Sequence, residues 1–482
     1  MTIVLTILVY FAALYLFSRI MTGRKTNNET FFRGNRKSPW YMVAFGMVGA
    51  SISGITFVSV PGMVMKMDMT YMQTCIGFIF GYFAIAFILL PIYYRNNLTT
   101  IYSYLGKRLG RRSYKTGAWY FLLSKIIGAS VRFYIVCVIL QDYVFVNIGI
   151  PFEITVAIMV ALIWLYTRKG GIKTLVWTDT FQTTCLFSAL ILIIVNVASS
   201  LDMNISEACH AIKDNSMSRI FVFDAPKSTQ YFWKQFLSGI FIVIVMTGLD
   251  QDMMQKNLTC KSLREAQKDM CTYGFAFVPA NALFLGLGIL LVLLATKTGI
   301  PLHSSGDSLL PMFAASGYMG ETVVILFTIG IVAASFSSAD SALTALTTCF
   351  CVDIIEKADD EKIRRRTHIL LCTLFVVFIL LFKVVNSTSV IDAIYIICSY
   401  TYGPLLGLFA FAILCPRVRP MDKAVPYIAI ASPIICYAID SLTQTVWGYK
   451  FGYELLILNG TLTFTGLLGS RYIQKAACQT PS

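Results

Sequence analysis

The chain has 482 residues, of which 57% are hydrophobic and 13% are charged, and its mean hydropathy is +0.70. Apolar segments of about 20 residues follow one another almost without interruption, which excludes a soluble globular protein and predicts an all-α polytopic membrane protein. The net charge of +14 lies in alternate loops rather than in a basic domain, so nucleic-acid binding is not expected.

About thirteen transmembrane helices are expected from the apolar segments. They cover residues 2–20, 40–64, 72–94, 116–146, 152–167, 173–198, 231–249, 271–296, 322–355, 368–386, 391–415, 424–443 and 453–470. The first segment has no basic residues before it and no small-residue cleavage site after it, so we interpret it as a retained helix rather than a signal peptide. The connections are short, which predicts a single membrane domain over residues 1–482.

The span at 40–64 is rich in residues that weaken a helix. Residues 46–64 read GMVGASISGITFVSVPGMV, with four glycines and Pro61 among hydroxyl side chains. In lipid, carbonyls released by a broken helix persist only where they line a cavity or bind an ion, so the pattern favours a broken, ion-binding helix. The alternative is a close helix crossing through Gly49 and Ser53.

The span at 116–146 carries two basic residues, Lys125 and Arg132. A guanidinium inside a bundle suits bidentate binding of a substrate carboxylate. The alternative is that Arg132 reaches the interface or pairs with an acid such as Asp142. Lys125 lies seven residues earlier on about the same face and is a candidate for a polar path from the cytoplasm.

Three later segments place acids in or next to spans. Residues 174–182 read TLVWTDTFQ, in which Asp179 is either a ligand or a solvated interfacial acid. Asp250 and Asp252 end the span at 231–249, as a cytoplasmic gate or as solvated acids, and we interpret the charged, helix-like segment 262–269 as a connector. Residues 333–347 read AASFSSADSALTALT, which offers the hydroxyl, carbonyl and carboxylate oxygens that a hard cation needs.

The distribution of Lys and Arg predicts the topology. Of 39 basic residues, 29 fall on one side of the predicted membrane, which places the N-terminus outside and the C-terminus in the cytoplasm. The cysteines show neither paired loop spacing nor CxxC clusters, so neither a disulfide nor a metal centre of that kind is expected. These features suggest a bacterial inner (cell) membrane.

Three strings carry a resemblance to a known family. They read RKGGIKTLVWTDTFQ, GLDQDMMQKNLTCKSLREAQ and AASFSSADSALTAL, and in this order and spacing they resemble the sodium/solute symporter family from about Asn35 to Pro416. The resemblance implies a LeuT-like inverted repeat of two five-helix halves over residues 40–415. One extra helix and a loop in 1–39 precede this core, and two extra helices and a tail in 416–482 follow it.

Two sodium sites are implied by the resemblance. The first combines backbone carbonyls with two hydroxyls, from Gly49, Ile52, Ala334, Ser337 and Ser338. The second, present in some members, would use Asp179, Ser337, Asp340 and Ser341. Asp340 departs from the family because a carboxylate replaces a hydroxyl, and three roles stay open for it: a stronger sodium site, a proton site, or a pair with a basic residue.

The resemblance also implies where substrate binds. Arg132 matches an arginine that holds the substrate carboxylate in the family's sialic-acid transporters. By position, Ser51, Ser53 and Thr56 offer hydroxyls. Phe236 offers a ring, and Gln73 is a further candidate.

We therefore expect a sodium-coupled secondary active symporter that imports a small polar organic solute, a carboxylate such as sialic acid, by alternating access, with Na⁺ as the coupling ion. The alternative is a sodium symporter for a neutral sugar or amino acid. A passive channel is a different class, for which the sequence has neither a filter motif nor a ring of acids. The three histidines lie in loops or at a span end, so an enzyme is not expected. The expected partners are substrate, sodium and the lipid bilayer, with the chain acting as a monomer.

Overall fold

The computed structural model describes residues 2–22, 27–142, 149–226, 228–302, 306–315, 319–385, 390–449 and 451–479. Within these ranges the regular elements are helices, and the β pairing amounts to one isolated bridge between Ser38 and Cys260. The predicted all-α class is therefore confirmed.

The helices follow one another along the whole chain. They are α1 (Thr2–Thr22), α2 (Asn28–Arg33), α3 (Trp40–Ser51), α4 (Gly54–Met67), α5 (Tyr71–Ala84), α6 (Leu90–Arg95), α7 (Ser103–Arg108), α8 (Arg111–Leu140), α9 (Phe152–Gly170), α10 (Ile172–Ser200), α11 (Ile205–Lys213), α12 (Phe232–Val243), α13 (Gln251–Asn257), α14 (Leu263–Thr298), α15 (Leu309–Ala315), α16 (Gly320–Cys349), α17 (Glu361–Val385), α18 (Val390–Leu414), α19 (Val425–Trp447) and α20 (Leu455–Gln479). Three π-helical segments, η2 (Ile85–Leu89), η6 (Ile244–Gly248) and η8 (Phe350–Ile354), extend α5, α12 and α16.

Each predicted span coincides with a helix or with consecutive helices, although the ends of the spans at 116–146 and 368–386 lie outside the described residues. Eight described helices are by themselves long and apolar enough to cross a membrane, and two bent pairs raise this number to ten. A multi-pass membrane protein is thus confirmed, while the number thirteen stays a prediction.

Two of the spans are broken. The axes of α3 and α4 differ by 63°, and α12 with η6 meets α13 at 70°. The glycines of the span at 40–64 predict the first break, which the structure confirms, whereas the second break was not expected. The segment 262–269 is helical as expected, but it is the start of the long helix α14 rather than only a connector, and Ser262 caps this helix by accepting a hydrogen bond from the N–H of Glu265.

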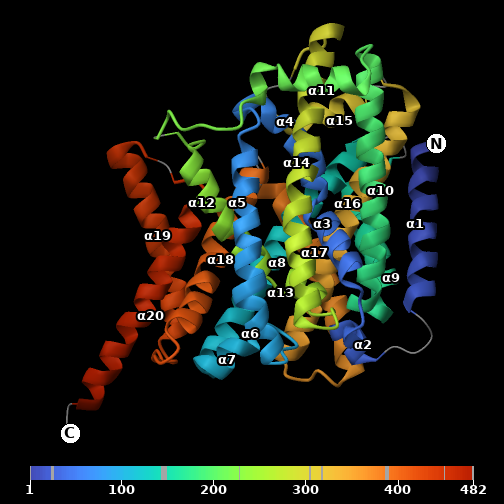
Figure 1. The fold of residues 1–482 in the computed structure, drawn as a ribbon. Coiled ribbons are helices and arrows are strands. Elements are labelled where there is room, and N and C mark those ends of the chain that lie inside the picture. The colour runs from blue at the N-terminus through green and yellow to red at the C-terminus, as the bar shows by residue number, and fades with distance from the viewer. Residues whose placement is uncertain are drawn as a thin grey trace.

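Helix α10 packs against α3 and α16, while α19 and α20 lie with α18 at one edge of the bundle (Figure 1). Outer helices expose large apolar side chains, such as Leu8 of α1 and Ile434 of α19, whereas the carboxylates of Asp179 and Asp340 are fully buried. This distribution suits a bundle surrounded by lipid, in which acids face the interior. The beginning of α1 and the end of α20 lie at opposite ends of the bundle (Figure 1).

Candidate functional site

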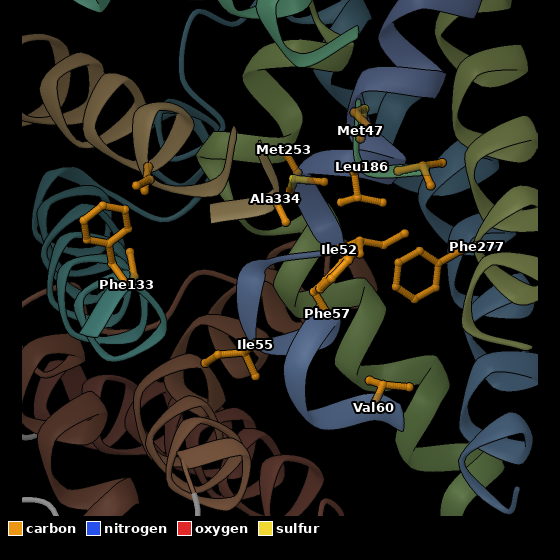
Figure 2. Close-up of a cluster of buried hydrophobic side chains, with 14 of the residues drawn as sticks. Met47, Ile52, Ile55, Phe57, Val60, Phe133, Leu186, Met253, Phe277 and Ala334 are labelled. Carbon is orange, nitrogen blue, oxygen red and sulfur yellow. The ribbon is translucent and has the colours of Figure 1, made fainter. Parts of the chain in front are cut away.

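The break between α3 and α4 frees a backbone oxygen in the middle of the bundle. Ile52 leaves the helical conformation at φ −77° and ψ 79°. In a continuous helix the N–H of Ser53 would bond the Gly49 carbonyl, but here it donates to the Ser51 carbonyl (3.0 Å). The Gly49 carbonyl is therefore available to a ligand. Figure 2 shows Ile52 at this break, close to Ala334 of α16.

Two glycines let neighbouring helices come close to the break. A Cβ at Gly49 would lie 1.8 Å from Oγ1 of Thr183 on α10, and a Cβ at Gly54 would lie 2.1 Å from Oγ of Ser335 on α16. Such distances are far inside van der Waals contact, so these crossings require glycine. Gly49 thus takes part in a close helix crossing, while the non-helical conformation itself lies at Ile52.

Oxygens of α3 and α16 converge at the break. The hydroxyl of Ser338 lies 2.9 Å from the carbonyl oxygen of Ala50 and 3.1 Å from that of Ala334. Four of the five residues predicted for the first sodium site thus surround the break. The fifth, Ser337, turns away and donates to Oδ1 of Asp179 at 2.7 Å. Carbonyls and hydroxyls with little formal charge suit a sodium ion that must be released.

The acids predicted for a second sodium site are brought together, but protein donors already engage them. Asp179 accepts from Ser337 and forms an ion pair with Nζ of Lys256, 2.8 Å from Oδ2. Asp340 accepts from the hydroxyl of Tyr166 at 2.6 Å and from that of Ser341 at 3.2 Å.

These contacts narrow the roles that stayed open for Asp340. The ion pairs of the described residues do not include Asp340, so a direct pair with a basic residue is not the arrangement seen. Its hydrogen-bond donors come from Tyr166 on α9 and from Ser341, its neighbour on α16. The carboxylate of Asp340 thus links α16 to α9 by a hydrogen bond inside the bundle.

A cavity lies beside the break, between α3, α4, α8 and the second broken helix. The predicted substrate residues Ser51, Ser53, Thr56 and Arg132 all line it. The hydroxyl of Ser51 also hydrogen-bonds that of Tyr273 on α14. A concave space with a few polar groups at a helix break is where substrates of such bundles bind.

Gln73 and Phe236 lie away from the lining of this cavity. The Gln73 amide donates to the carbonyl of Gln230 (2.9 Å) and accepts from the N–H of Val222 (3.1 Å). Phe236 packs its ring against Phe80 and other rings near the start of α12. The structure therefore does not bring these two predicted residues to the substrate cavity, because the loop after α11 and an aromatic cluster already use them.

A charged cluster joins three helices at the cavity. Nζ of Lys125 on α8 lies 2.7 Å from Oδ2 of Asp252 and 3.1 Å from Oδ2 of Asp250, and all three side chains are buried. The hydroxyl of Tyr402 on α18 donates to Asp250 at 2.7 Å. Asp250 and Asp252 are thus part of the cavity wall rather than solvated acids at a helix end.

Arg132 differs from Lys125 in its partners. None of the ion pairs within the described part of the chain involves Arg132. Asp142, the acid considered as its partner, is exposed. The guanidinium therefore lines the cavity with its capacity for a carboxylate unused.

Sequence reasoning missed Lys256, which the topology count placed among loop cations. The signal was its position four residues after Asp252, on the same face of a short helix. The contributions of Tyr166 and Tyr402 carried no such signal, because each comes from a distant helix.

The chain is similar in sequence and in structure to known sodium-coupled transporters. The family model described as "Sodium:solute symporter family" matches residues 31–421. Sodium/sialic acid symporter NanT of Aliivibrio fischeri is 25% identical, over 94% of this chain and 91% of its own length. Sodium-coupled monocarboxylate transporter 2 of Mus musculus is 23% identical, over 84% and 66% respectively. A solved substrate-bound outward-open Na⁺-coupled sialic acid symporter superposes with a TM-score of 0.83 at 20% identity, covering 98% of both chains.

The structural likeness confirms the transporter fold, although the inverted five-plus-five repeat stays a prediction. The family match covers most of the chain, so sodium is the coupling ion and the protein is a transporter rather than an enzyme. With these residues matched, the chain belongs to the sodium:solute symporter family.

Proposed function

We propose that this symporter imports a small organic carboxylate together with sodium by alternating access, and that sialic acid is the first candidate. The observation that carries the proposal is Arg132, which lines the cavity outside the ion pairs of the described residues, while Lys125 is held by two acids. A guanidinium presents a rigid fork of donors that matches a carboxylate.

The named relatives support an anionic substrate. One is a sialic acid symporter and another is a monocarboxylate transporter, and both names describe carboxylates. The hydroxyls of Ser51, Ser53 and Thr56 would serve the polar part of the solute. These hydroxyls suit a neutral sugar or amino acid equally well. The choice between an acid and a neutral solute therefore depends on whether transport requires Arg132.

Sodium in this proposal binds at the break, to the carbonyls of Gly49, Ile52 and Ala334 and to the hydroxyl of Ser338. Its support is the convergence of Ser338 with two carbonyl oxygens and the freed Gly49 carbonyl. Ser337 would join as fifth ligand only by leaving Asp179. Because the break borders the substrate cavity, ion and substrate would stabilise the same arrangement of α3 and α4.

The test is uptake into proteoliposomes. Labelled sialic acid, short monocarboxylates, a sugar and an amino acid would be compared under inward sodium and inward potassium gradients. We expect sodium-driven uptake of an acid, reduced at least about tenfold by Arg132→Ala and only partly restored by Arg132→Lys, since a lysine cannot bind bidentately.

Arg111→Ala is the matched control, because Arg111 begins the same helix and its side chain is 78% exposed. Uptake of a neutral solute only, unaffected by Arg132→Ala, would favour the sugar or amino-acid alternative. Uptake indifferent to sodium would overturn the coupling.

We also propose that the protein acts as a monomer in a bacterial inner membrane, with its N-terminus outside. The charge bias of the loops supports this orientation, and the opposite ends reached by α1 and α20 are compatible with it. Cys209 of α11 is exposed and would then react with a membrane-impermeant maleimide added to intact cells. Labelling of Cys209 only after cell lysis would instead indicate that the N-terminus lies in the cytoplasm.

A further inference from the structure

A buried lysine lies among the residues expected to hold a second sodium ion. The side chains of Lys256 and Asp179 are 2% and 1% exposed, and Nζ lies 2.8 Å from Oδ2. The other acids near this ammonium are Asp252 and Asp340. The position between α10, α13 and α16 thus already contains one positive charge that is covalently part of the chain.

The surroundings of this ion pair are polar and buried. Beyond the pair itself, Nζ of Lys256 has no hydrogen-bond partner among the described residues, while the side chains of Tyr10 and Gln182 interact with each other. Gln182 lies three residues after Asp179 on α10, and Tyr10 on α1 is next to it. A buried charge is costly unless it is paired, so the contact with Asp179 stabilises the ammonium of Lys256 in this interior.

Lys256 reaches this position because the seventh span is broken. The 70° bend after η6 directs α13 toward α10 and α16, and Asp252 and Lys256 lie four residues apart on one face of α13. Asp252 in turn is held by Lys125 at the substrate cavity. The ammonium is therefore positioned by the same short helix that forms part of the cavity wall.

We propose that the Lys256 ammonium takes the place of a second sodium ion at Asp179, so that the symporter binds and moves a single sodium. This inference rests on the proposed sodium site at the α3–α4 break and specifies what its neighbouring acidic site does. A second monovalent cation next to the ammonium would meet like-charge repulsion in a poorly solvated interior, while Asp179 is already neutralised.

The experiment counts sodium ions on the purified full-length protein by equilibrium binding of ²²Na⁺, without any organic substrate. We expect one ion per wild-type chain, bound about tenfold more weakly after Ser338→Ala. Lys256→Gln frees Asp179 and should bind two, whereas Lys256→Arg, which keeps the charge, should bind one. The second ion should disappear in the double variant Lys256→Gln/Asp179→Asn, whose buried pair is neutral.

Two ions on the wild-type chain would overturn the inference while leaving sodium coupling intact, and so would a monodisperse Lys256→Gln protein that still binds one. If Lys256→Gln does not fold, the wild-type count decides between the same two results. No ion on the wild type but one on Lys256→Gln would support the role of Lys256 and refute the proposed site at the break. No ion on either protein would refute both.

Discussion

Substituting Gly49 by alanine tests the link between helix packing and sodium binding. The added Cβ would lie 1.8 Å from Oγ1, 2.7 Å from Cβ and 2.9 Å from Cγ2 of Thr183, so rotation of the threonine cannot remove the overlap. To reach even 3.0 Å, α3 and α10 must separate by at least about 0.3 Å from Cβ of Thr183, and by about 1.2 Å if Oγ1 keeps its present position. Overpacking of this kind costs about 1–3 kcal/mol.

The separation would displace the Gly49 carbonyl from the hydroxyl of Ser338 across the proposed sodium site. We expect the sodium affinity of Gly49→Ala to fall at least about tenfold, which corresponds to roughly 1.4 kcal/mol. Sodium activation of uptake and ²²Na⁺ binding would both measure this effect. Gly469→Ala on α20 is the matched control, because a Cβ there meets nothing within 4 Å. Equal sodium affinities for the two variants would refute the reasoning.

Three further predictions concern other contacts. Ser338→Ala removes a hydroxyl that contacts two carbonyls at the break, so sodium activation should shift to about tenfold higher concentration, and an unchanged curve would exclude Ser338 as a ligand. Lys125→Met leaves buried Asp250 without its cation, which should lower stability by about 3–5 kcal/mol in thermal denaturation, whereas Lys125→Arg should largely retain it. The pKa of exposed Glu356 is lowered by its hydrogen bond to Lys115, so the pair stabilises the fold above the usual glutamate pKa and loses this effect as pH falls through the lowered value. Glu356→Gln should therefore show a smaller loss of melting temperature on acidification, and identical pH profiles would contradict the assignment.

The sequence was sufficient to predict features that depend on local composition. Apolar runs predict the helices, and Gly49 and Gly54 predict the first break because their lack of a side chain has a direct conformational meaning. The hydroxyl-rich string of α16 predicts the polar face that reaches this break. In these cases the chemistry of the residue and its position along one helix are enough to predict the feature.

Features that depend on contacts between distant helices could not be predicted. Lys256 follows a span and precedes charged residues, which is typical of a cytoplasmic loop, yet the bend before α13 buries it against Asp179. Gln73 has the polarity of a substrate ligand, but its amide serves the loop at Val222 and Gln230. A sequence read one span at a time does not show which helix lies opposite such a side chain.

The fixed charge of Lys256 also limits how far such a transporter can concentrate its substrate. One sodium ion moved with one singly charged carboxylate transfers no net charge, so a membrane potential of 100 mV, worth roughly 2.3 kcal/mol per charge, contributes nothing to accumulation. The inside-to-outside ratio of the acid then cannot exceed the outside-to-inside ratio of sodium. A cell with this protein would reach a lower substrate concentration ratio than it would with an electrogenic importer. In return, uptake would continue when the membrane is depolarised.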